Sequence, residues 1–256
     1  MTMKYNATPG LPTGQVLEIL ESPRWVRVVF NGQTIANSRR VLLLRERNQM
    51  PVYYFPREDV DDQWLKRTDH TTTCPYKGQA SYWTIKAGDR ESENAVWSYT
   101  HPLPACEQIK DYRAFYWDQV DHWYEEEEEV FKHPRDPFKR VDAIPSSRHV
   151  KIYLGGTLLA DSHRPVLVFE TGMPTRYYLP REDVRMEYLT PTNTHTVCPY
   201  KGTASYWSAT VNDEVHPDIV WGYPQPIPEI PKIRQLLCFY HEKVDQLVVD
   251  GTPVEK

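Results

Sequence analysis

Two short motifs carry the residue types best suited to chemistry, and the first of them contains a cysteine and a lysine. The motif Cys-Pro-Tyr-Lys-Gly begins at Cys74 and again at Cys198. Proline fixes φ and the closing glycine permits a positive φ, so the pattern predicts a tight turn that presents its Cys, Tyr and Lys side chains. A lysine three residues from a thiol could lower the thiol pKa and make Cys74 and Cys198 nucleophiles. Alternatively, the cysteines pack as small apolar side chains, and Lys77 and Lys201 reach solvent or bind a carboxylate or phosphate.

The second motif, Pro-Arg-Glu-Asp-Val, combines a fixed cation with paired carboxylates. Its first copy contains Arg57 and Glu58, and its second contains Arg181 and Glu182. Arginine suits bidentate binding of a carboxylate, and a partly buried glutamate can transfer protons. We therefore take Glu58, Glu182, Cys74 and Cys198 as the candidate catalytic residues. The simpler interpretation is a loop salt bridge in which the aspartate caps the following segment.

Aromatic residues surround both motifs. Neighbouring residues of a strand face opposite sides of a sheet, so one member of each Tyr-Trp pair should face the core and the other the opposite side. An outward aromatic side chain beside Arg and Lys would form a pocket for a flat or anionic small molecule. The candidate ligand-binding residues are Arg57, Tyr76, Lys77, Tyr82, Trp83, Arg176, Tyr178, Arg181, Tyr200, Lys201, Tyr206 and Trp207.

These motifs occur twice because the chain is an internal duplication. When the sequence is shifted by 124 residues, 26–121 aligns with 150–245 without a gap. A period above 100 residues indicates duplicated domains rather than a solenoid. We expect a first domain over 1–122 and a second over 148–256. Either copy could be the functional one, although the second has the additional residues Arg148, His149 and Arg176.

Between the two copies we expect an acidic and proline-rich linker over 123–147. This segment contains the run of glutamates from Glu125 to Glu129 and then several prolines and charged residues. Such a composition is typical of a solvated connector.

The elements that must hold these residues are predicted to be mostly strands. Each copy alternates apolar and polar residues around a turn, at Asn31-Gly32 and at Gly155-Gly156, which predicts a β-hairpin. Helical spacing occurs only around 107–116 and 231–240. We therefore predict a mainly β chain of antiparallel sheets, with at most a short helix in each domain.

Charge and composition argue against several classes of function. The formal net charge is −5, from 30 basic and 35 acidic residues, which does not fit a nucleic-acid-binding protein. We see no apolar run of the ~18 residues that a membrane helix requires and no signal peptide at the start, so we expect a cytoplasmic protein that binds neither nucleic acid nor membrane. The four cysteines form no Cys-x-x-Cys pair, which favours free thiols.

The repeated motifs, together with Val-Trp-Ser-Tyr at Val96 and Phe-Tyr-Trp-Asp at Phe115, resemble the DUF427 family in its tandem two-domain form. The resemblance implies a β-tent (Mss4-like) fold, in which two small antiparallel sheets meet at an angle. Several β-tent relatives hold zinc with paired Cys-x-x-Cys motifs, but each copy here has one such cysteine, so we expect no metal site and no cofactor. The family has also carried a nucleotidyltransferase-like label, yet the sequence lacks the expected phosphate and magnesium motifs.

The leading hypothesis is therefore binding of a small organic molecule, which could be anionic, in a pocket of aromatic, Arg and Lys side chains. Acid–base chemistry without a cofactor could accompany binding. The alternative is a non-catalytic structural or protein-interaction module, and nucleotidyl transfer is a weaker third hypothesis. The sequence leaves the oligomeric state open.

Overall fold

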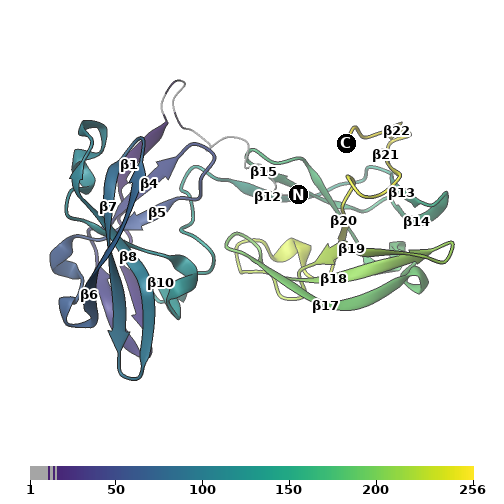
Figure 1. Cartoon of the computed structure of the whole chain (residues 1–256). Coiled ribbons are helices and arrows are strands. Elements are labelled where there is room, and N and C mark those ends of the chain that lie inside the picture. The colour runs from purple at the N-terminus through teal and green to yellow at the C-terminus, as the bar shows by residue number, and fades with distance from the viewer. Residues whose placement is uncertain (1–10, 12–13, 15) are drawn as a thin grey trace. The chain divides into compact units, whose positions relative to one another are not determined.

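The computed structural model describes residues 11, 14 and 16–256, and the chain divides into two compact units, 1–136 and 137–256 (Figure 1). The chain is mainly β, as predicted, and every described helical segment is a short 3-10 helix. The longest of these, η3, spans Pro104–Ile109. Within the described residues, no helix has the length and apolar character needed to cross a membrane.

The described residues of the first unit form eleven antiparallel strands. One sheet has the order β1-β4-β5, and its strands are Leu17–Glu21, Leu42–Glu46 and Val52–Tyr54. A second has the order β6-β7-β8-β9, with strands Leu65–Cys74, Gly78–Ala87, Arg90–Pro102 and Arg113–Phe115. The third has the order β11-β10-β2-β3, with strands Glu128–Glu129, His122–Glu125, Val26–Phe30 and Gln33–Ser38. The 3-10 helices η1, η2 and η4 are Arg57–Asp59, Asp62–Trp64 and Trp117–Gln119.

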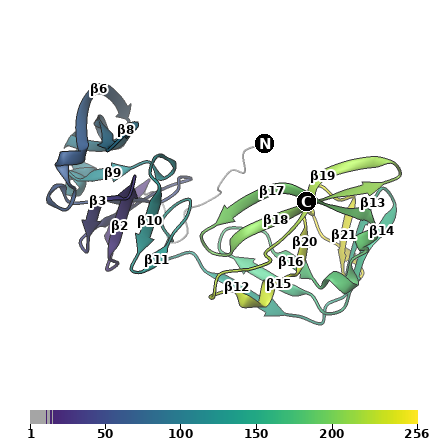
Figure 2. The same ribbon diagram turned by 90° about the horizontal axis from the view of Figure 1, so that it is seen from below.

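The second unit repeats this plan with a continuous seven-stranded sheet (Figure 2). Its order is β12-β15-β16-β20-β19-β18-β17, with strands Val141–Pro145, Val166–Glu170, Arg176–Leu179, Leu237–Phe239, Glu214–Gly222, Gly202–Val211 and Leu189–Cys198. The smaller sheet has the order β14-β13-β21-β22, with strands Thr157–Ser162, Val150–Leu154, Gln246–Val249 and Thr252–Pro253. The 3-10 helices η5, η6 and η7 are Arg181–Asp183, Met186–Tyr188 and Pro231–Ile233. In the first unit, a bridge between Phe55 and Arg113 joins β5 to β9 as β16 joins β20.

The structural repeat is longer than the self-alignment of the sequence. The shift of 124 residues places β1 on β12, β10 on β21 and β11 on β22, so the repeat covers 17–129 and 141–253. The segment expected as a linker, 123–147, thus contains strands of both units. These outer strands keep the burial pattern but not the residue identity. Trp123 and its equivalent Leu247 are both buried, for example, and a comparison of identities does not detect that match.

The acidic run also differs from a solvated connector. Glu125 is buried, accepts a hydrogen bond from the Tyr53 hydroxyl at 2.8 Å, and lies 3.0 Å from Arg24. Glu126 has a φ of 52° and forms the turn between β10 and β11. The run is therefore a hairpin whose first glutamate is held inside the unit by a cation and a hydroxyl.

The predicted hairpins are confirmed. Asn31 and Gly32 have φ of 49° and 72°, and Gly155 and Gly156 have φ of 56° and 72°. Two successive positive φ angles match the right-handed twist of the flanking strands, which explains the Asn-Gly and Gly-Gly pairs. The regions of helical spacing form the 3-10 segments η3 and η7, each followed by a short strand.

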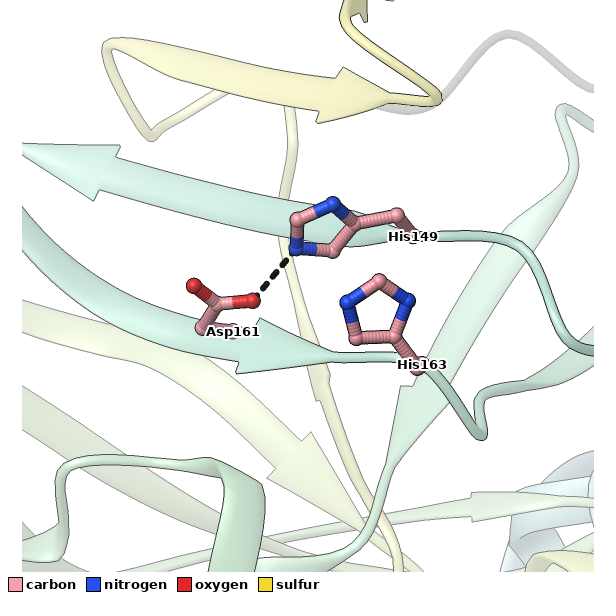
Figure 3. A group of neighbouring side chains, drawn as sticks. All are labelled: His149, Asp161 and His163. Carbon is pink, nitrogen blue, oxygen red and sulfur yellow. Dashed lines mark hydrogen bonds and ion pairs between the residues drawn. The ribbon is translucent and has the colours of Figure 1, made fainter.

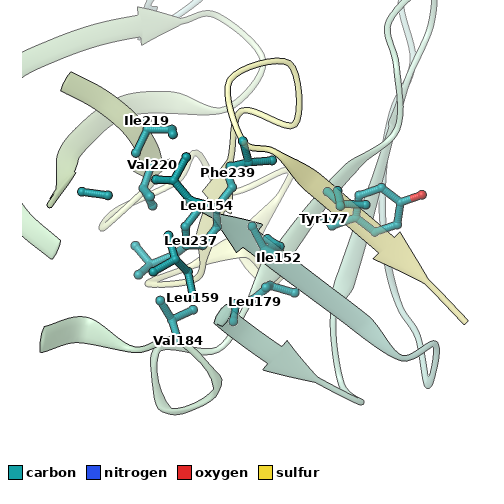
Figure 4. Packing of buried hydrophobic residues seen from close by; sticks show 14 of the residues in the cluster. Ile152, Leu154, Leu159, Tyr177, Leu179, Val184, Ile219, Val220, Leu237 and Phe239 are labelled. Carbon is teal, nitrogen blue, oxygen red and sulfur yellow. The ribbon is translucent and has the colours of Figure 1, made fainter. Parts of the chain in front are cut away.

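The seven-stranded sheet of the second unit packs against a separate apolar core on each face. Along β15, Leu167 belongs to the core shared with the smaller sheet, whereas Val166 and Val168 belong to a second core on the opposite face. Figure 4 shows the first of these cores, in which Ile152, Leu154 and Leu159 of the small sheet meet Leu237 and Phe239 of β20. The alternation follows from the two-residue period of a strand.

The close approach of two chain segments at Gly222 gives a test of this packing. A Cβ at Gly222 would lie 2.5 Å from the carbonyl oxygen of Leu236, so Gly222→Ala should destabilise the second unit by about 2 kcal/mol or more. The first repeat has Ser98 at this position, and Ser98→Gly should cost only about 1 kcal/mol. Calorimetric unfolding of both variants measures the difference. Equal shifts in melting temperature would contradict the close approach.

Candidate functional site

Both units have a hollow at the same place in the repeat. The first has a volume of about 420 Å³, and its lining residues are Arg57, Asp62, Leu65, Arg67, Trp83, Ser98, Thr100, Asp111 and Arg113. The second has a volume of about 510 Å³, and its lining residues are Arg181, Pro191, Thr192, His195, Ser205, Tyr206, Trp207, Gly222, Tyr223, Pro224, Gln235, Leu236 and Leu237. Seven of the positions that line the first hollow, those of Arg57, Arg67, Trp83, Ser98, Thr100, Asp111 and Arg113, have their equivalents in the lining of the second.

The second hollow is built where η5 approaches the open face of β17, β18, β19 and β20. Pro180 directly precedes η5, and its φ of −57° limits the backbone conformation at the start of the segment that carries Arg181. The Arg181 guanidinium carbon lies 5.4 Å from the centre of the Trp207 ring, within the range of a cation–π contact. Trp207 and Ser205 both belong to β18, and Ser205 is paired with His195 of β17.

In the first hollow two arginines share an acidic partner, Asp62. Asp62 accepts a hydrogen bond from Arg113, and its other oxygen lies 3.6 Å from Arg57. Burial alone would raise the pKa of Asp62, but Arg113 and Arg57 outweigh this effect, so the pKa lies below its usual value. Arg113 also lies over Trp83, at 5.1 Å from the ring centre. Both arginines therefore already have a partner within the repeat.

The second hollow lacks this acidic partner. At the positions of Asp62 and Arg113 the second repeat has Met186 and Leu237, and of these two Leu237 lines the hollow. Two further charged residues of the first repeat are replaced by uncharged ones: Pro191 stands at the position of Arg67, and Gln235 at that of Asp111. The described residues that line the second hollow include no carboxylate, and within the described chain Arg181 has no ion pair.

His195 adds a polar group with a defined orientation. Its Nδ1 lies 3.3 Å from the carbonyl oxygen of Ala204 and 3.5 Å from the hydroxyl of Ser205. A carbonyl oxygen only accepts hydrogen bonds, so Nδ1 is the donor in the contact with Ala204. The wall thus offers a cation, an imidazole and several aromatic rings.

The lysines of Cys-Pro-Tyr-Lys-Gly lie elsewhere. Lys77 and Lys201 are each 8% exposed and form ion pairs with Glu46 and Glu170. Glu170 also receives Lys139, at 2.8 Å. Burial alone would raise the pKa of Glu170, but Lys201 and Lys139 outweigh it, and the pKa lies below 4.5. Each lysine therefore ties its turn to the end of β4 or β15.

All four cysteines are free thiols. Cys74 and Cys198 are half-buried and pack against the apolar core on the side of the sheet away from the small sheet. Cys106 is buried and donates to the carbonyl oxygen of Tyr76 at 3.4 Å. Burial raises the pKa of the Cys238 thiol to about 12. None of the four lines either hollow.

The glutamates of Pro-Arg-Glu-Asp-Val lie on the surface. The Glu58 side chain is 65% exposed and 3.1 Å from Arg40, and that of Glu182 is 74% exposed and 3.6 Å from Arg164. Neither lines a hollow. The following aspartate accepts a hydrogen bond from a serine in each copy, Ser162 to Asp183 at 2.7 Å for example.

The remaining predicted residues divide between the hollows and other contacts. The side chain of Tyr206 packs in one core and that of Trp207 in the other, as the strand alternation predicted. Tyr82 is buried, with its hydroxyl 2.8 Å from Thr72, and Tyr178 accepts a hydrogen bond from Trp221 at 3.1 Å. Two others make contacts outside the hollows: Arg176 binds Glu242 at 2.8 and 2.9 Å, and the Tyr200 ring lies 5.5 Å from Lys139. Tyr76 is exposed.

The structure thus brings Arg181, Tyr206 and Trp207 together in one hollow and Arg57 and Trp83 in the other. Sequence reasoning did not assign His195, Leu237 or Met186 to a site. Leu237 and Met186 are detected by comparing the two repeats, because each is an apolar residue at a position where the first repeat has a charged one.

Comparison with known families agrees with the duplicated architecture. The sequence model of a domain of unknown function, DUF427, matches residues 18–126 and again residues 142–250. The chain belongs to the DUF427 family. Its two DUF427 domains correspond to the two structural repeats, while the β-tent fold stays a prediction. No curated protein matches the chain.

The buried ion pair of the second DUF427 domain gives a stability prediction. Glu170→Gln leaves Lys139 and Lys201 buried without their carboxylate, and should destabilise the domain by about 3 kcal/mol. Because the folded pKa of Glu170 is lowered, its stabilisation is present above the unfolded pKa and is lost as the pH falls through the folded pKa. Denaturation at pH 7 and at pH 3 should show a smaller effect of Glu170→Gln at the lower pH. Exposed Glu182→Gln is the control, with an expected change below about 0.5 kcal/mol.

Thiol labelling tests the cysteine assignment. Native protein treated with iodoacetamide should react at Cys74 and Cys198 before Cys106 and Cys238, because the first two are half-buried and the last two are buried. Mass spectrometry of the peptides gives the order. Labelling of Cys74 or Cys198 much faster than of an unfolded thiol would instead indicate an activated nucleophile.

Proposed function

We propose that the second DUF427 domain binds a small organic molecule with an anionic group and a flat or apolar body in the hollow beside Arg181. The observation that carries this proposal is the loss of the internal counter-charge: Asp62 neutralises Arg57 in the first repeat, and Met186 stands in its place in the second. A carboxylate or phosphate of the ligand would supply the charge that Met186 does not.

Arg181 suits this role. Its guanidinium offers donors in a planar arrangement that fits a carboxylate bidentately, and its contact with the Trp207 ring limits its orientations. Because Arg181 is exposed, its charge costs the free protein little desolvation. Ligand binding would then gain a charge-assisted hydrogen bond without breaking an existing ion pair.

The walls suit the rest of such a ligand. Trp207, Tyr223 and Leu237 offer apolar and aromatic surface, while His195 and Thr192 offer hydrogen-bonding groups. Pockets of this kind, mostly apolar with a few convergent polar groups, are typical sites for small molecules. The volume of about 510 Å³ is within the usual range for such sites.

In this proposal the hollow of the first repeat has a structural role and binds no ligand. Its hollow contains Arg57 and Arg113, which both form an ion pair with Asp62. We also propose that the protein acts in the cytoplasm and needs no cofactor for binding. Nucleotidyl transfer is disfavoured by the lining of the second hollow, because its described residues include no carboxylate to hold magnesium.

Binding of benzoate and phenyl phosphate, with benzamide as the uncharged analogue, tests the proposal. Titrations followed by NMR should show binding of the anions, and benzamide should bind at least about tenfold more weakly because it cannot make a charge-assisted hydrogen bond. Arg181→Gln should weaken anion binding by about tenfold or more.

Two variants make the test specific. Met186→Asp restores the carboxylate of the first repeat and should weaken anion binding as strongly as Arg181→Gln. Arg57→Gln is the matched control in the first repeat and should leave binding unchanged. Failure of both anions to bind the wild-type chain, or equal weakening by Arg57→Gln, would contradict a site at Arg181.

A further inference from the structure

A second cluster lies at the end of the β13–β14 hairpin, apart from the residues that line the hollow. His149 directly precedes β13, Asp161 is in β14, and His163 directly follows β14. Val150 pairs with Ser162 in the antiparallel ladder. The pairing continues outward to His149 opposite His163, and Asp161 lies two residues before His163 on the same face.

The three side chains converge. His149 Nε2 lies 2.5 Å from an oxygen of Asp161, and the two imidazole rings are stacked at 3.8 Å with an angle of 21° between their planes. One ligand atom from each residue lies within 4.8 Å of the others. Figure 3 shows one nitrogen of each imidazole directed to the side where the Asp161 carboxylate lies.

The first repeat shows that the fold does not require these residues. At the equivalent positions it has Trp25, Asn37 and Arg39. The Trp25 indole donates to the Asn37 amide oxygen at 2.5 Å, and the Arg39 guanidinium lies over the Trp25 ring at 4.6 Å. The stacked arrangement is thus common to both repeats, but only the second builds it from three potential metal ligands.

We propose that His149, Asp161 and His163 bind a divalent transition-metal ion, such as Zn²⁺, Co²⁺ or Ni²⁺. Two imidazoles and one carboxylate form a ligand set that prefers these ions to Mg²⁺ or Ca²⁺, which favour all-oxygen sites. Three protein ligands leave at least one coordination position for water or for a donor from another molecule. No cysteine belongs to the group, so the site differs from the zinc sites with paired cysteines.

The surroundings hold the ligands in place. Asp250 accepts a hydrogen bond from the backbone N–H of His149 at 2.9 Å, and the Asp250 N–H donates to the His149 carbonyl at the same distance. Lys151 lies 3.8 Å from the second oxygen of Asp161 and leaves the first oxygen to the imidazoles. Asp161 and His163 are exposed, so an ion can reach the site from solvent.

Isothermal titration of the full chain without a polyhistidine tag, at pH 7.5, tests the site with Zn²⁺ and Ni²⁺ alone. We expect one strong site per chain that millimolar Mg²⁺ does not compete for. With Co²⁺, the visible spectrum should show ligand-field bands without the thiolate charge-transfer band of a cysteine ligand. No binding of any of these ions to the wild type would overturn the proposal.

Variants taken from the first repeat identify the ligands. His163→Arg and Asp161→Asn introduce residues that the equivalent hairpin already accommodates, so both should fold, and each should weaken Zn²⁺ binding by at least about tenfold. His216→Gln is the control, because His216 is another imidazole of this unit that lies near a carboxylate, at 3.9 Å from Glu214. Unchanged affinity in both ligand variants, or a loss in the control alone, would assign binding to another place. Benzoate binding should persist in His163→Arg, which separates this site from the one at Arg181.

Discussion

The central constraint is that the seven-stranded sheet of the second unit packs against a separate apolar core on each of its faces. Consecutive residues of a strand must therefore enter different cores, as Val166 and Leu167 do. Polar side chains lie mainly along β17, most of which is exposed, and His195 of this strand lines the hollow.

Duplication separates the demands of folding from those of function. The cores of the two repeats occupy equivalent positions, whereas charged and polar residues change together in two regions. In the second repeat Met186 replaces a carboxylate, and Leu237 in the lining of the hollow replaces an arginine. At the hairpin end, a Trp, Asn and Arg group becomes His149, Asp161 and His163. Substitutions that change charge in concert at touching positions alter local chemistry, and they leave the packed cores intact.

Much of the fold could be predicted from sequence because its signals are local. Hairpin turns at Asn31-Gly32 and Gly155-Gly156, and the opposite faces of Tyr206 and Trp207, follow from residue type and strand period. The site could be predicted only in part. Lys201 has its carboxylate partner 31 residues earlier in the chain, and no local pattern indicates that contact. The register shift between Arg67 and Thr71 in β6 likewise interrupts the alternation of the strand, and no local pattern indicates it.

The proposed difference between Arg57 and Arg181, of which only Arg181 would bind a ligand anion, follows from the ion pair between Arg57 and Asp62. A carboxylate within ion-pair distance stabilises a guanidinium only modestly at the surface, so replacing Asp62 with the equivalent Met186 costs the fold little. The effect on recognition is larger, because a ligand anion at Arg57 would have to compete with a partner that is already in place. At Arg181 the same anion meets a cation held over an indole ring without a competing carboxylate. In the proposed site, loss of a weak stabilising contact would therefore be enough to turn a structural arginine into a binding residue.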